Sequence, residues 1–396
     1  MKIWIVSEFY ESPTDTVGGY YVKGVAEKLA STKNVEVVFP SYNSLSVIDD
    51  NSKLKINHIH KFGFNRKNLI TRTVAQLIMS LQFFVFLLPK VKKDDMVISF
   101  THPSFMIFVS IWLKKLKNTK VIIINYDLFP EILVGTGISK GNWLYRIIQK
   151  MFDKAYNNAD TIISLGSEMT QILKNKVYNG SPKIFTIPNW ADIDSIYFQK
   201  KETNEIILKY GLGSKIVFSY AGTIGRCQGI EKLLDLIDRI DHNNSIHFLF
   251  FGKGVAINSF KQQISKNRNQ KLISYGGFIV TEDRKMFINA CDVAIISLLD
   301  GMTGLNFPSK TYNILASGHP ILFVGKEDSE IAEMIKTFDI GWVCGSSDAF
   351  RFQKIINEIL HNPEDVRIKG NTARKIAEKY FAKEDILKQY YESITD

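Results

Sequence analysis

Residues 216–237, IVFSYAGTIGRCQGIEKLLDLI, combine the three parts of one structural unit. The apolar run Ile216–Tyr220 is followed by a turn that contains Gly222, Gly225 and Gly229. After the turn, apolar side chains recur at the spacing of one face of a helix. The stretch therefore predicts a strand, a glycine turn and an amphipathic helix.

This glycine turn offers a place for a phosphate group. A turn at the start of a helix exposes backbone N–H groups, and the helix dipole favours negative charge. Arg226 lies in the turn, and a guanidinium binds two phosphate oxygens with parallel hydrogen bonds. An ordinary βα turn with a surface arginine has the same sequence, so this stretch alone leaves both interpretations open.

Length and composition describe a folded protein of more than one domain. The chain has 396 residues, of which 45% are hydrophobic and 23% are charged, and this length predicts two domains of about 150–200 residues each. Cys227, Cys291 and Cys344 lie far apart, which argues against a disulfide framework or a zinc site and indicates a reducing compartment. The N-terminus reads as a first strand and not as a signal peptide.

Apolar strands alternate with amphipathic helices along the chain. The runs at Met96–Phe100 and Val121–Asn125 are almost entirely apolar, as expected for parallel strands covered on both faces. The polar stretch Asp192–Asn204 predicts a linker, after which the pattern restarts. The other expected strands are Lys2–Ser7, Val35–Phe39, Thr161–Leu165, Lys183–Ile187, Ile216–Tyr220, Ile246–Phe251, Leu272–Gly276, Val293–Leu298, Pro320–Val324 and Gly341–Val343.

Two successive α/β units predict two Rossmann-like domains that face a cleft. We expect an N-terminal domain at residues 1–190 and a C-terminal domain at residues 191–379. A C-terminal helix at about residues 380–396 is expected to pack back on the first domain. In that domain, a loop containing Gly18 and Gly19 is expected to precede a helix at Val22–Ala30.

Positive charge is concentrated in one segment. The chain carries a net charge of +10, and residues 61–120 hold eleven Lys or Arg against Asp94 and Asp95, which leaves +1 for the rest. The apolar stretches Leu77–Leu88 and Phe105–Leu113 of this segment are shorter than the ~20 residues that cross a bilayer. They are either buried helices or a basic, partly exposed apolar face that rests on an anionic membrane leaflet. No stacking platform or DNA-binding motif supports a nucleic-acid partner.

Several short segments occur in an order that resembles a known family, the retaining glycosyltransferases of family 4, which have the two-domain GT-B fold. The forms YAG-x-x-G-R-x-Q-G and P-S-K are similar to those of the bacterial branch that builds O-antigen and capsule, including N-acetylfucosamine transferases. The segments that carry the resemblance are Gly18-Gly19, Asp127–Glu131 (DLFPE), Ile187–Asp192 (IPNWAD), Tyr220–Gly229, Phe250–Gly254 (FFGKG), Ala290–Ala294 (ACDVA) and Phe307–Pro320 (FPSKTYNILASGHP).

The resemblance implies a nucleotide-sugar site in the C-terminal domain and an acceptor site in the N-terminal one. The residues that it implies as catalytic are Asp127, Arg226 and Lys310. Those implied as donor-binding are Gly19, Thr223, Gly225, Arg226, Gln228, Gly254, Phe278, Ile279, Ser309, Lys310 and Asn313, and those implied as acceptor-binding are Tyr20, His102, Asp127 and Glu131.

The physical chemistry of these residues agrees with that division. The turn at Gly225 and Arg226 and a second helix N-terminus at Ser309 and Lys310 together supply N–H groups and cations. They can stabilise a departing diphosphate, so neither a metal ion nor a cofactor is expected. Other interpretations stay open: Asp127 as the cap of a helix at Leu128–Leu133, His102 as part of a plain turn, and Lys310 as a solvated charge.

The sequence departs from the family pattern at the donor site and beside Asp127. Two positions where many members carry glutamate hold Leu305 and Asn313. Thr223 and Gln228 replace cations of the phosphate turn, which leaves Arg226 as its main charge. The histidine that usually precedes the acceptor-side aspartate is Tyr126. His58-x-His60 has no third ligand near it for a metal site, and Asp192-x-Asp194 lies in the linker, where turn and cap chemistry accounts for it.

We therefore expect an enzyme that moves a sugar from a nucleoside-diphosphate sugar to a lipid-linked saccharide, with retention of configuration, in cell-surface polysaccharide synthesis. It is expected in the cytoplasm, on the anionic inner face of the plasma membrane, which it contacts through residues 61–120. The alternatives are a nucleotide-sugar 2-epimerase of the same fold, and a catalytically weak sugar-nucleotide-binding or scaffold protein of a polysaccharide assembly complex.

Overall fold

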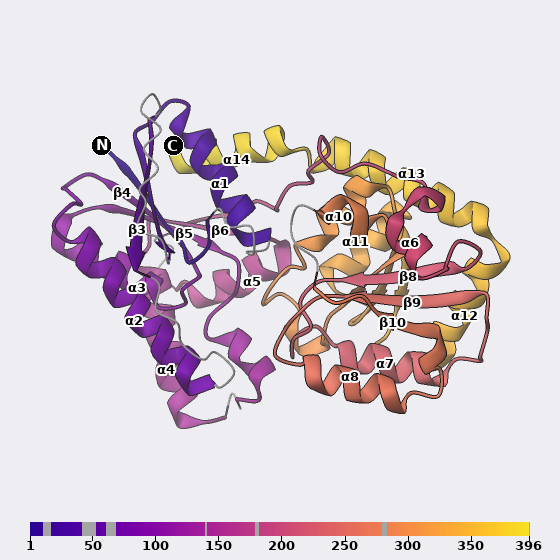
Figure 1. Ribbon diagram of the computed structural model, residues 1–396. Helices are drawn as coiled ribbons and strands as arrows, with labels where there is room; N and C mark the ends of the chain where they lie inside the picture. The colour runs from indigo at the N-terminus through magenta and orange to yellow at the C-terminus, as the bar shows by residue number, and fades with distance from the viewer. Residues whose placement is uncertain are drawn as a thin grey trace. The chain divides into compact units, whose positions relative to one another are not determined.

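The computed structural model describes the chain as two compact units (Figure 1). The N-terminal unit comprises Met1–Pro188 together with Gly304–Phe307 and Glu384–Asp396, and the C-terminal unit comprises Asn189–Thr303 and Pro308–Lys383. The residues that the structure describes are 1–10, 17–41, 53–60, 69–138, 141–178, 182–278 and 283–395.

The N-terminal unit is built on a parallel sheet of seven strands in the order β3-β2-β1-β4-β5-β6-β7. The strands are β1 (Ile3–Val6), β2 (Val35–Ser41), β3 (Leu54–His60), β4 (Met96–Phe100), β5 (Lys120–Asn125), β6 (Thr161–Ser164) and β7 (Lys183–Thr186). The helices are α1 (Val17–Ala30), α2 (Leu69–Leu87), α3 (Met106–Lys117), α4 (Trp143–Asn157), α5 (Ser167–Lys176) and α14 (Lys383–Thr395), with a 3-10 turn η1 (Glu131–Thr136).

The strands of this sheet lie close to their expected positions because their apolar runs are buried, β4 completely and β5 except for Lys120. β3 is not in the expected series, since it is a half-exposed edge strand with several polar side chains. The expectation of a loop at Gly18 and Gly19 was wrong, because both lie in α1. A side chain at Gly19 would place its Cβ 2.1 Å from the carbonyl oxygen of Tyr10, so this helix packs directly on the preceding backbone.

The C-terminal unit is built on a parallel sheet of six strands in the order β10-β9-β8-β11-β12-β13. The strands are β8 (Ile216–Ala221), β9 (Ile246–Phe251), β10 (Ile273–Tyr275), β11 (Val293–Ser297), β12 (Ile321–Val324) and β13 (Gly341–Cys344). The helices are α6 (Glu205–Lys209), α7 (Ile230–Arg239), α8 (Ile257–Lys266), α9 (Arg284–Ile288), α10 (Lys310–Ser317), α11 (Glu330–Phe338), α12 (Ala349–His361) and α13 (Pro363–Tyr380), with 3-10 turns η2 (Lys201–Thr203), η3 (Gln270–Leu272) and η5 (Asp300–Met302).

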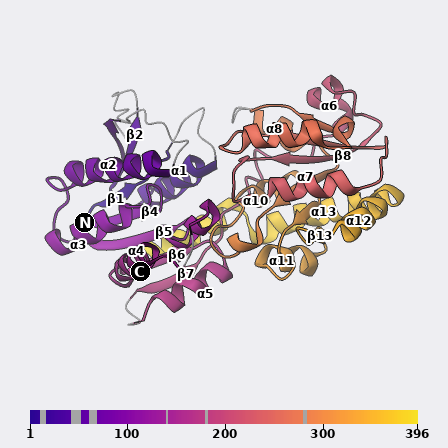
Figure 2. The same ribbon diagram turned by 90° about the horizontal axis from the view of Figure 1, so that it is seen from below.

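Helices cover both faces of this second sheet. In Figure 1, α7 and α8 lie on one side of β8–β10, and α10 and α11 lie on the other. The side chains that bury α7 against the sheet include Ile230, Leu233, Leu234 and Ile237, which is the apolar face expected from the sequence. Figure 2 shows α12 and α13 next to each other, and they are in contact.

The strand order of each sheet reverses at one point. It reverses between β1 and β4 in the first sheet and between β8 and β11 in the second. In open parallel sheets, ligands bind beyond the carboxyl ends of the strands at such a reversal. Ligand sites are therefore expected at two places, the carboxyl ends of β1 and β4 and the carboxyl ends of β8 and β11.

Candidate active site

In the C-terminal unit, the loops beyond β8, β9 and β10 are tied together by their backbones. Gly222 donates to the carbonyl of Phe251 at 3.0 Å, and Ile224 donates to Lys253 at 3.0 Å. A Cβ at Gly252 would lie 1.8 Å from the oxygen of Gly222, and one at Gly254 would lie 2.1 Å from the oxygen of Ile224. Glycine is required at both positions because the two loops touch through their backbones. The turn predicted to bind phosphate is thus held rigid by its neighbour.

Lys310 lies beside this turn. Its ammonium donates to the carbonyl of Ile295 in β11 at 3.1 Å and lies 3.5 Å from the centre of the Tyr220 ring. A Cβ at Gly222 would be 3.8 Å from the same Nζ. Burial holds the pKa of Lys310 well below its usual value. The interpretation of Lys310 as a solvated charge was therefore wrong, because the cation points into the protein at the reversal of the strand order.

Arg226 lies at the surface of the turn. It is exposed, and its guanidinium forms no hydrogen bond or ion pair with any residue in the part of the chain that the structure describes. Gln228 folds back on the turn, since a Cβ at Gly225 would lie 2.5 Å from its Oε1. Thr223 is exposed, and its carbonyl accepts from the hydroxyl of Tyr220 at 2.8 Å. Because the backbone of the turn is held by its neighbours and the guanidinium has no described partner, Arg226 is able to reach a ligand.

The N-terminus of α10 contributes to the same place. Ser309 caps the helix without a side-chain hydrogen bond, so the first N–H groups of α10 are not satisfied by that side chain. Asn313 is 2% exposed, and among the described residues its Oδ1 has no hydrogen-bond partner. Buried polar atoms are nearly always bonded, so both features favour a ligand here. The ribose-binding role of Asn313 stays a prediction.

The remaining donor-side predictions fall on other elements. Phe278 is 39% exposed, and the ammonium of Lys253 lies 3.8 Å from its ring centre. Ile279 lies outside the described residues. Gly19 belongs to the N-terminal unit, where its packing on Tyr10 already accounts for a glycine. Its donor-binding role stays a prediction.

In the N-terminal unit, His102 and Asp127 come together at the carboxyl ends of β4 and β5. His102 Nε2 lies 3.0 Å from Asp127 Oδ2. The hydroxyl of Thr101 accepts from the backbone N–H groups of Tyr126 at 3.0 Å and of Asp127 at 3.1 Å. Glu8, which follows β1, donates from its backbone to the carbonyl of His102 at 2.7 Å. The strand ends at the first reversal therefore carry an organised polar cluster.

The charge of His102 depends on its neighbours. Burial by itself lowers the pKa of this imidazole, but the carboxylates of Asp127 and then Glu8 outweigh burial, and the pKa lies above its usual value. The backbone of Asp127 pairs with Asn306 in an antiparallel bridge, and η1 begins only at Glu131. The interpretation of Asp127 as a helix cap was therefore wrong.

Glu131 has a structural partner. Its Oε1 lies 2.5 Å from the ammonium of Lys176, and both side chains are less than a tenth exposed. Asp153 contacts the same ammonium at 2.5 Å. Burial first, and then Glu131 and Asp153, raise the pKa of Tyr145 to about 12. Since Glu131 already neutralises a buried lysine, it is less available to an acceptor than the sequence implies.

Tyr20 is the last of the predicted acceptor residues. It lies in α1, and its ring meets that of Tyr21 edge to face, with 5.4 Å between ring centres. Its acceptor role stays a prediction. Within the described ranges, no group of three His, Cys, Asp or Glu side chains is placed to hold a metal ion.

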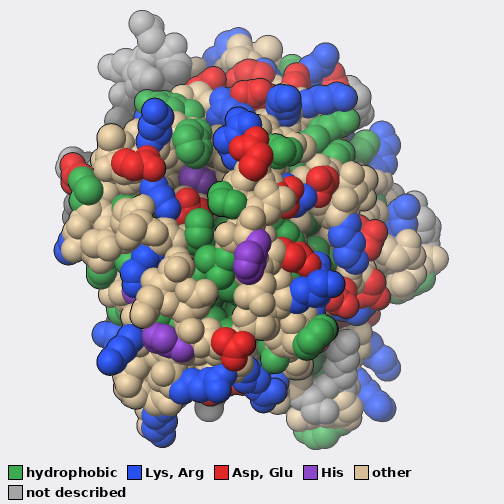
Figure 3. All heavy atoms as spheres, turned by 90° about the vertical axis from the view of Figure 1, so that its right-hand side faces the viewer, with side chains coloured by type: hydrophobic (Ala, Val, Ile, Leu, Met, Phe, Trp, Pro, Cys, Tyr) green, Lys and Arg blue, Asp and Glu red, His purple; other side chains and the backbone are tan. Residues whose placement is uncertain are grey.

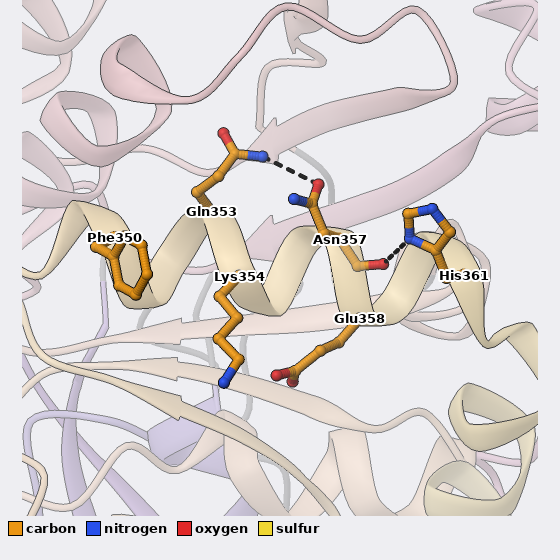
Figure 4. Close-up of a pocket in the computed structure, with 6 residues that line it drawn as sticks. All are labelled: Phe350, Gln353, Lys354, Asn357, Glu358 and His361. Carbon is orange, nitrogen blue, oxygen red and sulfur yellow. Dashed lines mark hydrogen bonds between the residues drawn. The ribbon is translucent and has the colours of Figure 1, made fainter.

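A surface pocket lies on α12 of the C-terminal unit (Figure 4). All of its lining residues belong to α12, and Asn357 accepts from Gln353 at 3.0 Å and from His361 through its carbonyl at 2.7 Å. The hollow is therefore formed by the side chains of one helix. The lining residues are Phe350, Gln353, Lys354, Asn357, Glu358 and His361.

Sequence reasoning missed Tyr220 and Thr101. Tyr220 stands in the quoted stretch, directly before the glycine turn, but an aromatic residue near the end of a strand gives no signal beyond core packing. Thr101 directly follows β4, and its position beside His102 was the available signal. Both residues hold backbone groups of the candidate site.

Residues 202–376 match the family model described as "Glycosyl transferases group 1". The chain is 29% identical over 385 residues to the Pseudomonas aeruginosa protein named "Probable glycosyltransferase WbjE", covering 96% of this chain and 94% of that protein. It is 22% identical over 321 residues to the Escherichia coli strain K12 protein named "Putative colanic acid biosynthesis glycosyl transferase WcaI", covering 79% of this chain and 76% of that protein.

The fold also matches a solved structure of Anabaena HepE in complex with UDP-glucose. The TM-score is 0.74 at 13% sequence identity, and the match covers 100% of this chain and 99% of that one. The matches support a glycosyltransferase with the GT-B fold. The two parallel-sheet domains of that fold are the units described above.

Proposed function

We propose that this glycosyltransferase moves a sugar from a nucleoside-diphosphate sugar to a lipid-linked saccharide, with retention, in the synthesis of a cell-surface polysaccharide. The observation that carries the proposal is the ammonium of Lys310, which is 3.1 Å from the carbonyl of Ile295 and beside Gly222. A buried cation next to a rigid glycine turn is suited to a diphosphate. The name of WcaI, which refers to colanic acid biosynthesis, supports the polysaccharide.

The donor side binds the diphosphate without a metal ion in this proposal. Lys310, the exposed Arg226 and the open N-terminus of α10 each favour negative charge. These groups stabilise the charge that develops as the bond between the anomeric carbon and the diphosphate oxygen breaks. The structure of HepE with UDP-glucose, which has the same fold, supports a nucleotide-sugar as the donor.

On the acceptor side, Asp127 orients the attacking hydroxyl. A protonated His102 donates to Asp127 and fixes its carboxylate, and Thr101 fixes its backbone. The acceptor oxygen forms the new bond to the anomeric carbon, and its proton passes to the departing phosphate oxygen. Asp127 therefore acts as an orienting group and takes up no proton in the balanced step.

A lipid-linked acceptor requires the enzyme to work at a membrane surface, and three neighbouring helices support this. α2 packs on α3, and α3 packs on α4, all in the N-terminal unit (Figure 1). Each helix buries one side and exposes apolar side chains on another, up to 72% for Trp143. We call these exposed side chains the α2–α4 face: Val74, Leu77, Leu81 and Val85 of α2, Trp112 and Leu116 of α3, and Trp143, Leu144, Ile147 and Met151 of α4.

Basic residues flank this face. Lys90, Lys92 and Lys93 follow α2 and are exposed, as are Lys115 in α3 and Lys150 in α4. A positive rim around an apolar patch complements an anionic leaflet. By contrast, Lys, Arg, Asp and Glu side chains are intermixed on the surface drawn in Figure 3. None of the helices in the described part of the chain is long and apolar enough to cross a membrane.

The helices α2 and α3, which hold most of residues 77–88 and 105–113, are buried on one side and exposed on another. α2 and α3 bury Phe83 and Leu113 in the core, whereas Leu81 is 58% exposed. Lysine neutralisation must spare Lys114, because its ammonium binds Asp160 at 2.7 Å. Membrane contact through this face is part of the proposal.

The test is sugar transfer with a panel of UDP-, GDP- and dTDP-sugars. Donors are first selected by thermal shift, since a ligand at 100 times its dissociation constant stabilises by about 2.7 kcal/mol. The selected donor is then supplied with membrane lipid extract, and the product linkage is assigned by NMR. Retention is supported if the anomeric proton of the transferred sugar has the same orientation, axial or equatorial, in the product as in the donor. Tight nucleotide binding without turnover would favour the scaffold alternative, which the substitutions at Leu305 and Asn313 keep open.

A further inference from the structure

Lys310 is an unusual cation, because the described part of the chain provides it with no anion. Its described contacts are the carbonyl of Ile295 at 3.1 Å and the face of the Tyr220 ring at 3.5 Å. Among the described residues, no carboxylate lies within 4.0 Å of its ammonium, the limit for an ion pair. An ammonium has three donors, and a carbonyl and an aromatic face account for two of them.

Tyr220 is placed to hold this cation. Tyr220 belongs to β8, is 1% exposed and lies in the buried cluster that includes side chains of α7 and α8. The face of an aromatic ring attracts a cation, and the attraction grows when water is excluded. The hydroxyl at the end of the same ring donates to the carbonyl of Thr223 at 2.8 Å. One rigid side chain thus touches both the cation and the glycine turn.

We propose that Tyr220 is a positioning residue for the donor site: its ring holds the Lys310 ammonium beside the turn, and its hydroxyl fixes the Thr223 carbonyl. The distance between the cation and the N–H groups of the turn is then set by one side chain in the core. The third donor of the ammonium is left for a phosphate oxygen. The inference rests on the proposed function only for the identity of that ligand.

The environment of Lys310 has a consequence for its proton. Burial is the cause of its lowered pKa, with no contribution from a charged neighbour. A diphosphate supplies the missing negative charge, so its binding raises the pKa of Lys310 and takes up a proton at pH values between the free and bound pKa. The charged and titratable groups on the elements packed around Lys310 are Tyr220 of β8, Arg226 and Cys227 of the turn, Lys253 after β9, Arg284 and Lys285 of α9, Tyr312 of α10, and Glu364, Asp365, Arg367, Lys369, Arg374, Lys375, Glu378, Lys379 and Tyr380 of α13.

Those groups either contact other residues or do not contribute to the lowered pKa of Lys310. Lys253 lies over the Phe278 ring and Lys285 lies over the Tyr197 ring. Arg374 binds the carbonyl of Ala316, at the opposite end of α10. β11 has no titratable side chain and offers only the carbonyl of Ile295. The ring of Tyr220 is therefore the contact whose removal changes the stability of the cation most directly.

The test measures the proton of Lys310 without any ligand. The whole protein is labelled with [¹³Cε]lysine, the Lys310 signal is assigned by its loss in Lys310→Met, and the signals are titrated by NMR. We expect Lys310 to titrate clearly below the other lysines. Tyr220→Leu removes the ring and should lower the midpoint by a further amount of about one pH unit. Tyr220→Phe keeps the ring and should leave the midpoint almost unchanged.

Phe218→Leu is the matched control, since Phe218 lies on the same strand and in the same buried cluster. It removes a ring from the core without touching Lys310 and should not move the midpoint. The inference is overturned if Lys310 titrates with the other lysines, or if Tyr220→Leu and Phe218→Leu behave alike. Addition of UDP should then raise the Lys310 midpoint. If the Lys310 midpoint is lowered and depends on Tyr220, but no nucleoside diphosphate changes it, the proposed donor is contradicted. The role of Tyr220 is then still supported.

Discussion

His102 Nε2 and Asp127 Oδ2 are 3.0 Å apart at the carboxyl ends of two neighbouring strands, β4 and β5. Both side chains keep about a fifth of their surface exposed, so the pair is anchored in the protein and still open to a substrate. The imidazole is the donor and the carboxylate is the acceptor. Because the sequence separates the two residues widely, only the sheet brings them together.

The first prediction concerns the protonation of His102. Its pKa lies above the usual value because Asp127 and Glu8 outweigh burial. The stability that the charged pair contributes is therefore fully present below the ordinary histidine pKa and is lost as the pH rises through the raised pKa. Asp127→Asn removes the larger of the two carboxylate effects, so the pKa of His102 should fall. NMR titration of the imidazole measures this pKa. An unchanged value would show that Asp127 does not raise the pKa of His102.

The second prediction concerns Arg226. Its guanidinium is exposed and free of described partners, so Arg226→Ala should leave the melting temperature unchanged. Loss of one preorganised cation at a departing group costs about 10²–10³-fold in kcat. The measurement is transfer under saturating donor. Arg239→Ala is the control, because Arg239 is an exposed arginine in the last turn of α7. Equal activity of the two variants would exclude Arg226 from the site.

Much of the fold could be predicted from the sequence because parallel strands buried on both faces leave apolar runs. The expected strand at Met96–Phe100 has the observed bounds of β4, and that at Ile246–Phe251 those of β9. β3 could not be found in this way, because an edge strand needs an apolar side chain only on its covered face. Gly19 was misread as a loop residue because close contact with the Tyr10 carbonyl leaves no sequence pattern.

The candidate site was predicted in part. Asp127, His102 and Lys310 were named from motifs; His102 and Asp127 follow the neighbouring strands β4 and β5, and Lys310 begins α10. What the sequence could not provide is which groups touch. The ring of Tyr220 under Lys310 depends on the pairing of β8 with β11, and Lys176 reaches Glu131 only through the fold.

The third prediction separates two roles of Glu131. The carboxylate and the Lys176 ammonium are both buried, and removing one partner of a buried pair costs about 3–5 kcal/mol. Glu131→Gln should therefore lower the free energy of unfolding by about 3 kcal/mol, with Asp153 keeping part of the charge of Lys176 compensated. Urea denaturation measures it.

A double replacement tests the same pair from the other side. Glu131→Met with Lys176→Met removes both charges of this buried pair and leaves only Asp153, which is 25% exposed, without its partner, so the loss should be smaller than for Glu131→Gln alone. An acceptor role for Glu131 requires the opposite result: a raised KM for the acceptor with little change in stability. That result would restore the prediction made from the sequence.

The fourth prediction concerns membrane contact through the α2–α4 face. Lys90, Lys92 and Lys93 are exposed beside it, and each basic residue near an anionic leaflet contributes about 1 kcal/mol. Replacement of all three by Gln should weaken partition to phosphatidylglycerol vesicles by about 10²-fold. Replacement of Leu81 and Trp143 by Ser should weaken it as well, because apolar contact adds to the attraction.

The salt dependence of binding and the position of the replaced lysines distinguish contact through the α2–α4 face from nonspecific attraction by net charge. High ionic strength should release the lysine-dependent part of the binding and leave the apolar part. The control replaces Lys354, Lys375 and Lys379, which lie on α12 and α13 in the C-terminal unit, by Gln. If both triple variants lose binding equally, net charge alone explains the partition and the α2–α4 face has no special role. If only the first loses it, and transfer to a lipid-linked acceptor falls while donor hydrolysis does not, the face presents the enzyme to its acceptor.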